Sequence, residues 1–118
     1  MHNLLRSVTL LNNKVLTLLG FAAKANKLSY GFDAVHTALS QKKSKLVLIA
    51  YDVSPKSKKE VLFFSDKFKT KAVVLDEYNM ETVSHAVGHK CGIISVNDIS
   101  FSDGLLSVIN AGRNLNDK

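Results

Sequence analysis

A short, uninterrupted apolar run most constrains how this chain can fold. After Lys45 the sequence reads Leu-Val-Leu-Ile-Ala over residues 46–50. A strand with apolar side chains at every position needs cover on both of its faces, as a central strand has between two layers of helices. The run therefore predicts an α/β fold with helices on both sides of a small sheet.

The segments around this run alternate between helical and extended patterns. Upstream, apolar residues recur at helical spacing and are followed by an extended piece that ends at Gly31, a residue suited to a tight strand-to-helix junction. Downstream, Ser54 and Pro55 supply an N-cap and an N1 proline for another helix, and Gly88 ends a later one. We predict helices over about 13–25, 32–41, 55–67, 80–87 and 102–112, with strands over 27–30, 45–50, 71–75 and 91–96.

The chain is expected to form a single domain. Its 118 residues and 46% hydrophobic content suffice for one core. We expect residues 1–12 to be a mobile lead-in and 113–118 a mobile polar tail. No apolar run approaches the roughly 20 residues of a membrane span. One cysteine, Cys91, allows no intrachain disulfide, which fits a reducing cytoplasm. We expect a monomer that does not contact a membrane.

The charge of the chain favours a polyanionic partner. The net charge is +6 and the isoelectric point is near 9.5, so a domain of this size attracts nucleic acid. Residues 1–71 hold thirteen Lys or Arg against four acids, whereas residues 72–118 hold three against six. One part of the molecule is therefore expected to face the anion.

No catalytic or cofactor-binding pattern stands out. His85 and His89 are four residues apart, but Gly88 interrupts their helix and no carboxylate completes a zinc motif. No glycine-rich phosphate loop is present, and Cys91 at the start of an apolar strand is expected to be a buried, inert thiol. We predict a protein without catalysis, cofactor or metal.

Lysines do recur around the predicted helix starts. Helix N-termini expose unpaired N–H groups and a partial positive charge, so the starts at Gly31 and Ser54 are natural sites for phosphate or base-edge contact. The alternative is that the lysines only form a solvated face that keeps the protein soluble. The residues concerned are Lys24, Lys27, Lys42, Lys43, Lys45, Lys56, Lys58 and Lys59.

The helix after Gly31 should present a polar stripe. If Val35, Ala38 and Leu39 face the core, helical spacing leaves Asp33, Thr37 and Ser40 exposed. Asp33 could accept hydrogen bonds from guanine N–H donors. Its simpler interpretation is a first-turn acid that complements the helix dipole.

The sequence resembles a known RNA-binding family. The resemblance rests on three segments between Leu19 and Pro55, which are, in order, Leu-Gly-Phe-Ala, Lys-Leu-Ser-Tyr-Gly and Leu-Val-Leu-Ile-Ala-Tyr-Asp-Val-Ser-Pro. They resemble the kink-turn-binding ribosomal proteins of the large subunit, of the seven-Ae and thirty-e types, and especially their small bacterial homologues. The resemblance covers roughly residues 13–112. It implies a three-layer α-β-α sandwich around a four-stranded mixed sheet, no catalysis, and a structured RNA partner with tandem sheared G·A pairs.

The resemblance also implies which residues contact RNA. The family's helix begins Gly-x-Asn-Glu with a lysine three residues later, where this chain has Gly31, Asp33, Ala34 and Thr37. Only the glycine matches, although Asp33 resembles the acid of several bacterial members. Each lost contact is worth about 1–3 kcal/mol. The second and third contact loops map to Asp52, Val53 and Ser54 and to Gly88, His89, Lys90 and Cys91.

The leading hypothesis is therefore non-catalytic binding of a ribosomal or regulatory RNA. The alternative is a protein-interaction module of the transcription or translation machinery that keeps the fold without kink-turn specificity, and an enzyme is the third choice. The predicted RNA contacts are Lys24, Lys27, Gly31, Phe32, Asp33, Ala34, Thr37, Asp52, Val53, Ser54, Gly88, His89 and Lys90.

Overall fold

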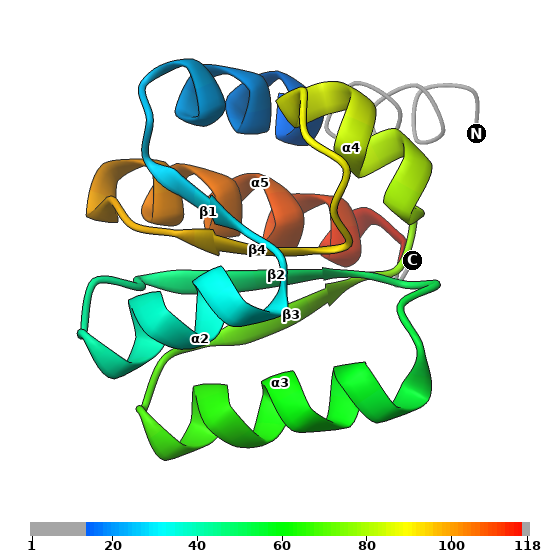
Figure 1. The fold of residues 1–118 in the computed structure, drawn as a ribbon. Helices are drawn as coiled ribbons and strands as arrows, with labels where there is room; N and C mark the ends of the chain where they lie inside the picture. The colour runs from blue at the N-terminus through cyan, green and yellow to red at the C-terminus, as the bar shows by residue number, and fades with distance from the viewer. Residues whose placement is uncertain (1–13, 117–118) are drawn as a thin grey trace.

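The computed structural model describes residues 14–116, and the predicted lead-in over 1–12 lies outside them. Residues 14–24 form an N-terminal helix. The elements that follow alternate along the chain (Figure 1): β1 (Leu28–Tyr30), α2 (Phe32–Ser40), β2 (Leu46–Ala50), α3 (Pro55–Lys67), β3 (Ala72–Leu75), α4 (Met80–Val87), β4 (Ile93–Val96) and α5 (Ile99–Asn116).

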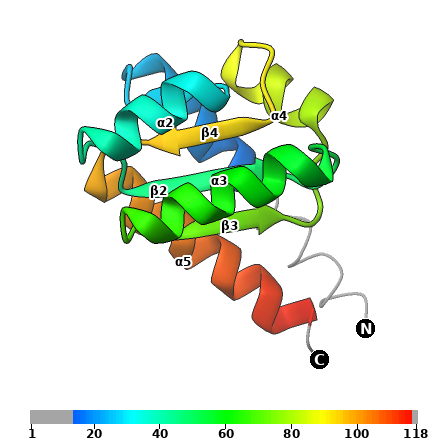
Figure 2. The ribbon, with the colours of Figure 1, turned by 60° about the horizontal axis from the view of Figure 1, so that its bottom comes forward.

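The four strands form one mixed sheet in the order β1-β4-β2-β3. β2 and β3 are parallel, whereas β4 is antiparallel to both β1 and β2, so Leu48 pairs with Val73 on one side and Ile94 on the other. α2 and α3 lie in front of the sheet and α5 behind it (Figure 2). The predicted three-layer α-β-α sandwich is confirmed.

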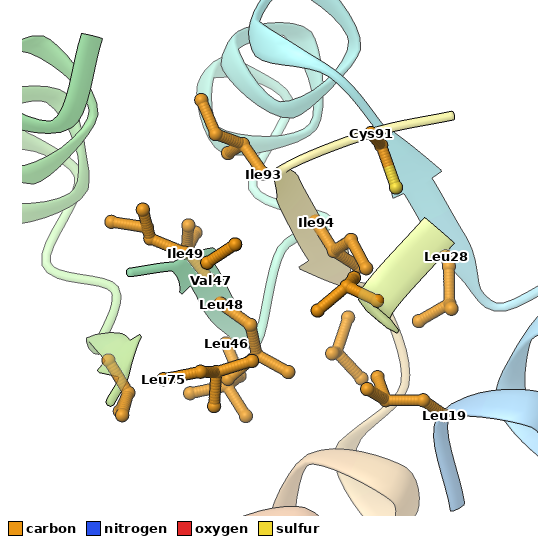
Figure 3. Packing of buried hydrophobic residues seen from close by; sticks show 14 of the residues in the cluster. Leu19, Leu28, Leu46, Val47, Leu48, Ile49, Leu75, Cys91, Ile93 and Ile94 are labelled. Carbon is orange, nitrogen blue, oxygen red and sulfur yellow. The ribbon is translucent and has the colours of Figure 1, made fainter. Parts of the chain in front are cut away.

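The apolar run that predicted a central strand lies at the centre of the core. Every residue of β2 is at most 1% exposed, and its side chains belong to one buried cluster with those of Ile94, Leu75 and Leu19 from other elements (Figure 3). Burying a side chain such as Leu or Ile contributes roughly 1.5–3 kcal/mol. The continuous apolar pattern thus reflects cover from both helical layers.

The strand directions give the sheet two unlike edges. β1, β2 and β3 run one way and β4 the other. We call the edge where β1, β2 and β3 end and β4 begins the strand-end edge, and the opposite one the strand-start edge. In Figure 1 the strand-start edge is on the left and the strand-end edge, with the turn between β2 and α3, is on the right.

The last helix differs from its predicted bounds at both ends. It begins at Ile99 because Asp98 caps it: the Asp98 carboxylate accepts from the Phe101 amide at 2.9 Å. It continues through residues of the predicted tail to Asn116. Arg113 ties this extension to β3, donating to the Val74 carbonyl at 2.7 Å and lying 3.6 Å from the Asp76 carboxylate.

Candidate nucleic-acid interface

The strand-end edge brings together the three segments that the sequence predicted to contact RNA. The Gly31 amide, between β1 and α2, donates to the Ile93 carbonyl at 2.9 Å. The Ala50 amide, at the end of β2, donates to the Gly92 carbonyl at 2.8 Å. The start of α2, the β2–α3 turn and the α4–β4 loop are therefore neighbours around the first residues of β4.

Gly31 has a backbone that few residues other than glycine adopt. Its φ of 87° and ψ of 164° turn the chain from β1 directly into α2. No side chain caps α2, and Val35 donates to the Gly31 carbonyl in the first helical bond. The N–H groups of the first turn are thus available to an external acceptor, as the sequence suggested.

The polar stripe on α2 is exposed as predicted. Asp33, Ala34, Thr37 and Ser40 are exposed, whereas Val35, Ala38 and Leu39 are buried. The Ser40 hydroxyl donates to the Thr37 carbonyl at 3.0 Å, so it is tied to its own helix. Asp33, Ala34 and Thr37 remain as the exposed face of α2 near its start.

Phe32 has a different position from its neighbours on α2. Its ring packs edge-on against Phe64 of α3, with centroids 6.3 Å apart. His36, one turn on, lies edge-on to the same ring at 4.4 Å. Phe32 therefore fixes α2 against α3 and is only half exposed to a partner.

Two polar side chains of the β2–α3 turn make hydrogen bonds that hold the local structure together. The Asp52 carboxylate accepts from the Met80 amide at 2.8 Å, which joins the turn to the start of α4. The Ser54 hydroxyl accepts from the Ser57 amide at 3.3 Å and caps α3, as the Ser-Pro pair predicted. The Val53 side chain is only 7% exposed and packs into the protein. That the Val53 position contacts RNA stays a prediction.

Gly92 explains why Val53 is buried. A Cβ atom on Gly92 would lie 2.6 Å from the Met80 sulfur and 2.8 Å from a Val53 methyl. Only glycine allows the β2–α3 turn, the start of α4 and the start of β4 to pack this closely. Sequence reasoning missed Gly92, because a single glycine beside an apolar strand gives no sign of what approaches it.

The α4–β4 loop is held against the end of β1. Gly88, His89 and Lys90 are exposed, and the His89 ring stacks on Tyr30 with centroids 4.1 Å apart and planes 16° from parallel. This pair links residues far apart in sequence and was not predicted. His89 therefore lies directly beside the Gly31 junction.

Cys91 anchors the other end of this loop. Its amide donates to the Ser84 hydroxyl at 2.9 Å, and that hydroxyl donates back to the Cys91 carbonyl at 3.0 Å. Burial raises the pKa of the Cys91 thiol, with the Ser84 hydrogen bond opposing it. The thiol is buried and held in its neutral form, as the sequence predicted.

Two exposed side chains add apolar surface to the strand-end edge. Tyr51, directly after β2, is 46% exposed, and Met80, at the start of α4, is 41% exposed. Flat or polarisable side chains at such a place are suited to stacking against an unpaired base. Neither was predicted, because the sequence does not show which apolar residues the packing leaves outside.

Lys24 and Lys27 do not belong to this interface. Lys27 immediately precedes β1, and its carbonyl accepts from the Asn97 amide beyond the end of β4. β1 carries the chain across the sheet, about 10 Å or more between Lys27 and Gly31. The prediction that these lysines flank the start of α2 is wrong, and both lie at the strand-start edge.

The strand-end edge is close to neutral. Its loops and helix starts hold four lysines and five acids: Lys56, Lys58, Lys59 and Lys90 against Asp33, Asp52, Asp76, Glu77 and Glu81. The Lys58 ammonium group also donates to the Tyr51 carbonyl at 3.3 Å, so it is partly engaged by a hydrogen bond within the protein. Charge alone therefore does not mark this edge as an RNA surface.

His85 is exposed on α4 and, with Leu16, Thr17 and Glu81, lines a shallow groove against the N-terminal helix. Among residues 14–116, no three His, Cys, Asp or Glu side chains gather in a way that could hold a metal. In the same part of the chain, no helix is long and apolar enough to cross a membrane.

Comparison with known proteins gives one family. Residues 13–102 match the ribosomal protein L7Ae/L30e/S12e/Gadd45 family. A solved structure of a protein with unknown function from Bacillus halodurans has a TM-score of 0.77 and 31% identity, covering 82% of this chain and 97% of its own. The Giardia lamblia 15.5kD RNA binding protein shares the fold, with a TM-score of 0.70, 15% identity and 89% coverage of both chains. No curated protein matches the sequence.

Proposed function

The chain belongs to the ribosomal protein L7Ae/L30e/S12e/Gadd45 family, and on this basis we propose that it binds a structured RNA through its strand-end edge. The observation that carries the proposal is the meeting of three loops at Gly31, Gly92 and Ala50. It explains why residues far apart in sequence can read one RNA feature. We place the protein in the cytoplasm as a monomer, on ribosomal or regulatory RNA.

The geometry favours recognition by shape and base edges. The uncapped start of α2 offers N–H donors, and Asp33 beside it offers an acceptor for guanine N–H groups. Tyr51 and Met80 offer surface to an unstacked base. A sharply bent RNA with exposed sheared G·A pairs presents these features together, so a kink-turn is the proposed ligand. The Giardia lamblia structural neighbour is an RNA binding protein, which agrees with this ligand class.

The proposal includes no catalytic step. Cys91, the one thiol, is buried and its pKa is raised. A protein-interaction role remains the second candidate, favoured by the exposed Tyr51 and Met80 together with Ala34 and Thr37 in place of the family's charged pair.

A direct test compares two RNAs of equal length. Wild-type protein is titrated with a kinked RNA that carries tandem sheared G·A pairs and with a straight duplex. We expect preference for the kinked RNA, and we expect Asp33→Ala to reduce that preference by about 1–3 kcal/mol because a guanine acceptor is lost. Equal affinity for both RNAs in the wild type would favour the protein-interaction role.

A gain-of-function variant sharpens the same test. Ala34→Glu/Thr37→Lys restores the charged pair of the family on the exposed face of α2. We expect tighter binding to the kinked RNA by roughly 1–3 kcal/mol, with the straight duplex unchanged. Ala34→Gln/Thr37→Gln is the matched control, since it adds the side-chain length without the charges. An equal gain in both variants would contradict the assigned roles.

A further inference from the structure

The strand-start edge carries an unusual concentration of lysines. It is formed by the ends of the N-terminal helix, α2 and α3 and by the starts of the strands that follow them, on the left in Figure 1. Eight of the sixteen basic residues of the chain lie there, against the acids Asp66, Asp98 and Asp103. We call this set the basic edge: Lys24, Lys27, Lys42, Lys43, Lys45, Lys67, Lys69 and Lys71, all exposed.

The same local geometry repeats three times at the basic edge. The N-terminal helix, α2 and α3 each end with one residue in the left-handed region: Asn26 at φ 61°, Lys42 at φ 61° and Lys69 at φ 57°. In each case the next amide reaches back to the helix, as Lys43 does to the Ala38 carbonyl at 2.9 Å. This is the Schellman ending, which usually has glycine at the left-handed position.

Two of these endings use lysine although glycine or asparagine costs less there. A residue with a Cβ atom is disfavoured in the left-handed region, so Lys42 and Lys69 go against local preference. Departures from local preference are expected at functional or strained sites. The presence of lysine at these two positions therefore indicates that the exposed side chain has a task beyond ending the helix.

The ammonium groups of the basic edge are free for an external anion. Within the described side chains, none of the eight forms an ion pair or a hydrogen bond to a protein acceptor. Lys67 alone has a close internal contact, over the Phe68 ring at 5.7 Å. One cation near each helix end is enough to complement the helix dipole. Lys45 and Lys71 lie beyond the helices, directly before β2 and β3, so the helix dipoles do not account for them.

A hydrogen-bond chain holds the backbone of the basic edge in place. The buried Ser44 and Ser95 hydroxyl oxygens are 2.7 Å apart, and Ser95 donates to the Asn97 side-chain oxygen at 2.6 Å. The Asn97 amide then donates to the Ser29 hydroxyl at 2.8 Å. The chain joins the segments of β1, β4 and β2, so Lys27 and Lys45 are held on either side of Asn97.

We propose that the basic edge binds the phosphate backbone of an RNA segment other than the one read at the strand-end edge. The proposal rests on the proposed function for its choice of RNA as the polyanion. Lysine is a strong point charge for phosphate and is depleted in protein interfaces, so this surface fits a nucleic-acid backbone better than an acidic protein. The contact is independent of base sequence.

The separation of the two edges sets the size of the RNA. Lys45 and Tyr51 are six strand positions apart, or about 20 Å. A short kinked RNA reaches the strand-end edge alone, whereas a kinked RNA with one lengthened stem reaches both edges. The basic edge would then add affinity and salt dependence without adding base specificity.

The experiment uses three RNAs and one main variant. Fluorescence anisotropy at several KCl concentrations measures the binding of wild type and Lys27→Gln/Lys43→Gln/Lys45→Gln to a short kinked RNA, the same RNA with a lengthened stem, and a straight duplex. We expect the wild type to bind the lengthened RNA with a steeper salt dependence than the short one. The variant should lower that logarithmic slope by roughly two to three, and its affinity for the short RNA should change less than about twofold.

Several results would overturn the proposal. One is a slope for the lengthened RNA that the variant leaves unchanged, and another is an equal loss of affinity for the short and lengthened RNAs. Single variants provide a matched control, because Lys43→Gln and Lys14→Gln remove the same charge but only Lys43 lies at the basic edge. Equal effects of these two would also refute it.

The straight duplex separates this proposal from the proposed function. If kinked RNA has no advantage but the duplex binds and the triple variant weakens it, the reading site fails and the basic edge stands. If kinked RNA is preferred but the triple variant binds every RNA as wild type does, the basic edge fails alone. Thermal unfolding of each variant confirms that the compared proteins are folded.

Discussion

The two edges of the sheet differ in how they are built and in what they offer a partner. The strand-end edge is nearly neutral, with a glycine junction at Gly31, an uncapped helix start and fitted loops around Gly92. The strand-start edge is strongly positive, with three similar helix endings and lysines that make no ion pairs within the described residues. The strand-end edge therefore offers a partner a fixed shape, and the strand-start edge offers it positive charge.

This division matches the two components of nucleic-acid binding. Base edges and bent shapes are read by fixed geometry, whereas phosphate contacts add affinity that falls with salt. Changes at the strand-end edge should therefore alter the preference between kinked and straight RNA. Changes at the basic edge should alter the salt dependence of binding to the straight duplex and to kinked RNA with a lengthened stem.

Gly31→Ala should have the largest effect. A Cβ atom there would meet no other atom within 4 Å, so the cost comes from the backbone, on the order of 1–3 kcal/mol at such φ and ψ angles. A shift of the α2 start should weaken kinked RNA by about tenfold or more, since 1.4 kcal/mol corresponds to tenfold. Urea denaturation and anisotropy titration measure the two effects.

The matched control is Gly104→Ala, in the interior of α5. Its Cβ atom would lie 3.9 Å from Leu18, an ordinary contact, so we expect stabilisation of roughly 0.5–1 kcal/mol and unchanged RNA binding. If Gly31→Ala weakened straight duplex and kinked RNA equally, the assignment of shape recognition to the strand-end edge would be wrong.

Ser95→Ala tests the rigidity of the opposite edge. Ser95 is fully buried, and its removal leaves the Ser44 hydroxyl and the Asn97 oxygen without their partner, at a cost of about 1–3 kcal/mol. We expect lower stability in urea and weaker binding to straight duplex, while the preference for kinked RNA persists. Ser107→Ala, an exposed position on α5, should change stability by less than about 0.5 kcal/mol.

Asp52→Ala should have a smaller effect, at the strand-end edge. It removes the acceptor of the Met80 amide at the start of α4, which by analogy with helix caps costs roughly 0.5–2 kcal/mol. Kinked RNA should bind more weakly because the β2–α3 turn loses its tie to α4. Asp52→Asn keeps an oxygen acceptor and should retain most of the stability; an equal loss in both variants would point to the charge of Asp52 instead.

The sequence predicted the fold more completely than the site. Apolar periodicity, the Ser54–Pro55 helix start and the run 46–50 follow local rules, and the structure confirms each of them. Asp98 was missed as a cap, so α5 begins three residues earlier than predicted. Local signals thus determine the elements, within a few residues at their ends.

Which side chains of the candidate site are exposed was predicted correctly on α2, whereas positions that depend on the sheet were predicted wrongly. The exposed face of α2 follows from its 3.6-residue period. Lys27 was misplaced because closeness to Gly31 in sequence hides the crossing of β1. Tyr30 and His89 were missed because their stacking depends on β1 pairing with β4, which no local pattern shows.

The smallest expected effect concerns the two lysines with left-handed backbones, and here the direction of the change in stability is what informs. Lys42→Gly and Lys69→Gly each relieve a left-handed residue, which favours folding by about 1–2 kcal/mol, offset by roughly 0.5–1 kcal/mol for the added freedom of glycine when unfolded. We expect stability to stay equal or rise by up to about 1.5 kcal/mol. Straight-duplex binding should nevertheless weaken, with a salt slope lower by about one per variant.

Asn26→Gly completes this comparison, because Asn26 occupies the same left-handed position at the end of the N-terminal helix without a charge. It should gain a similar small stability and keep the wild-type salt slope. If all three variants behaved alike, Lys42 and Lys69 would serve only to end their helices. Opposite signs in stability and duplex affinity for the two lysine variants would instead show that the chain keeps these lysines against its own folding preference because they contact a polyanion.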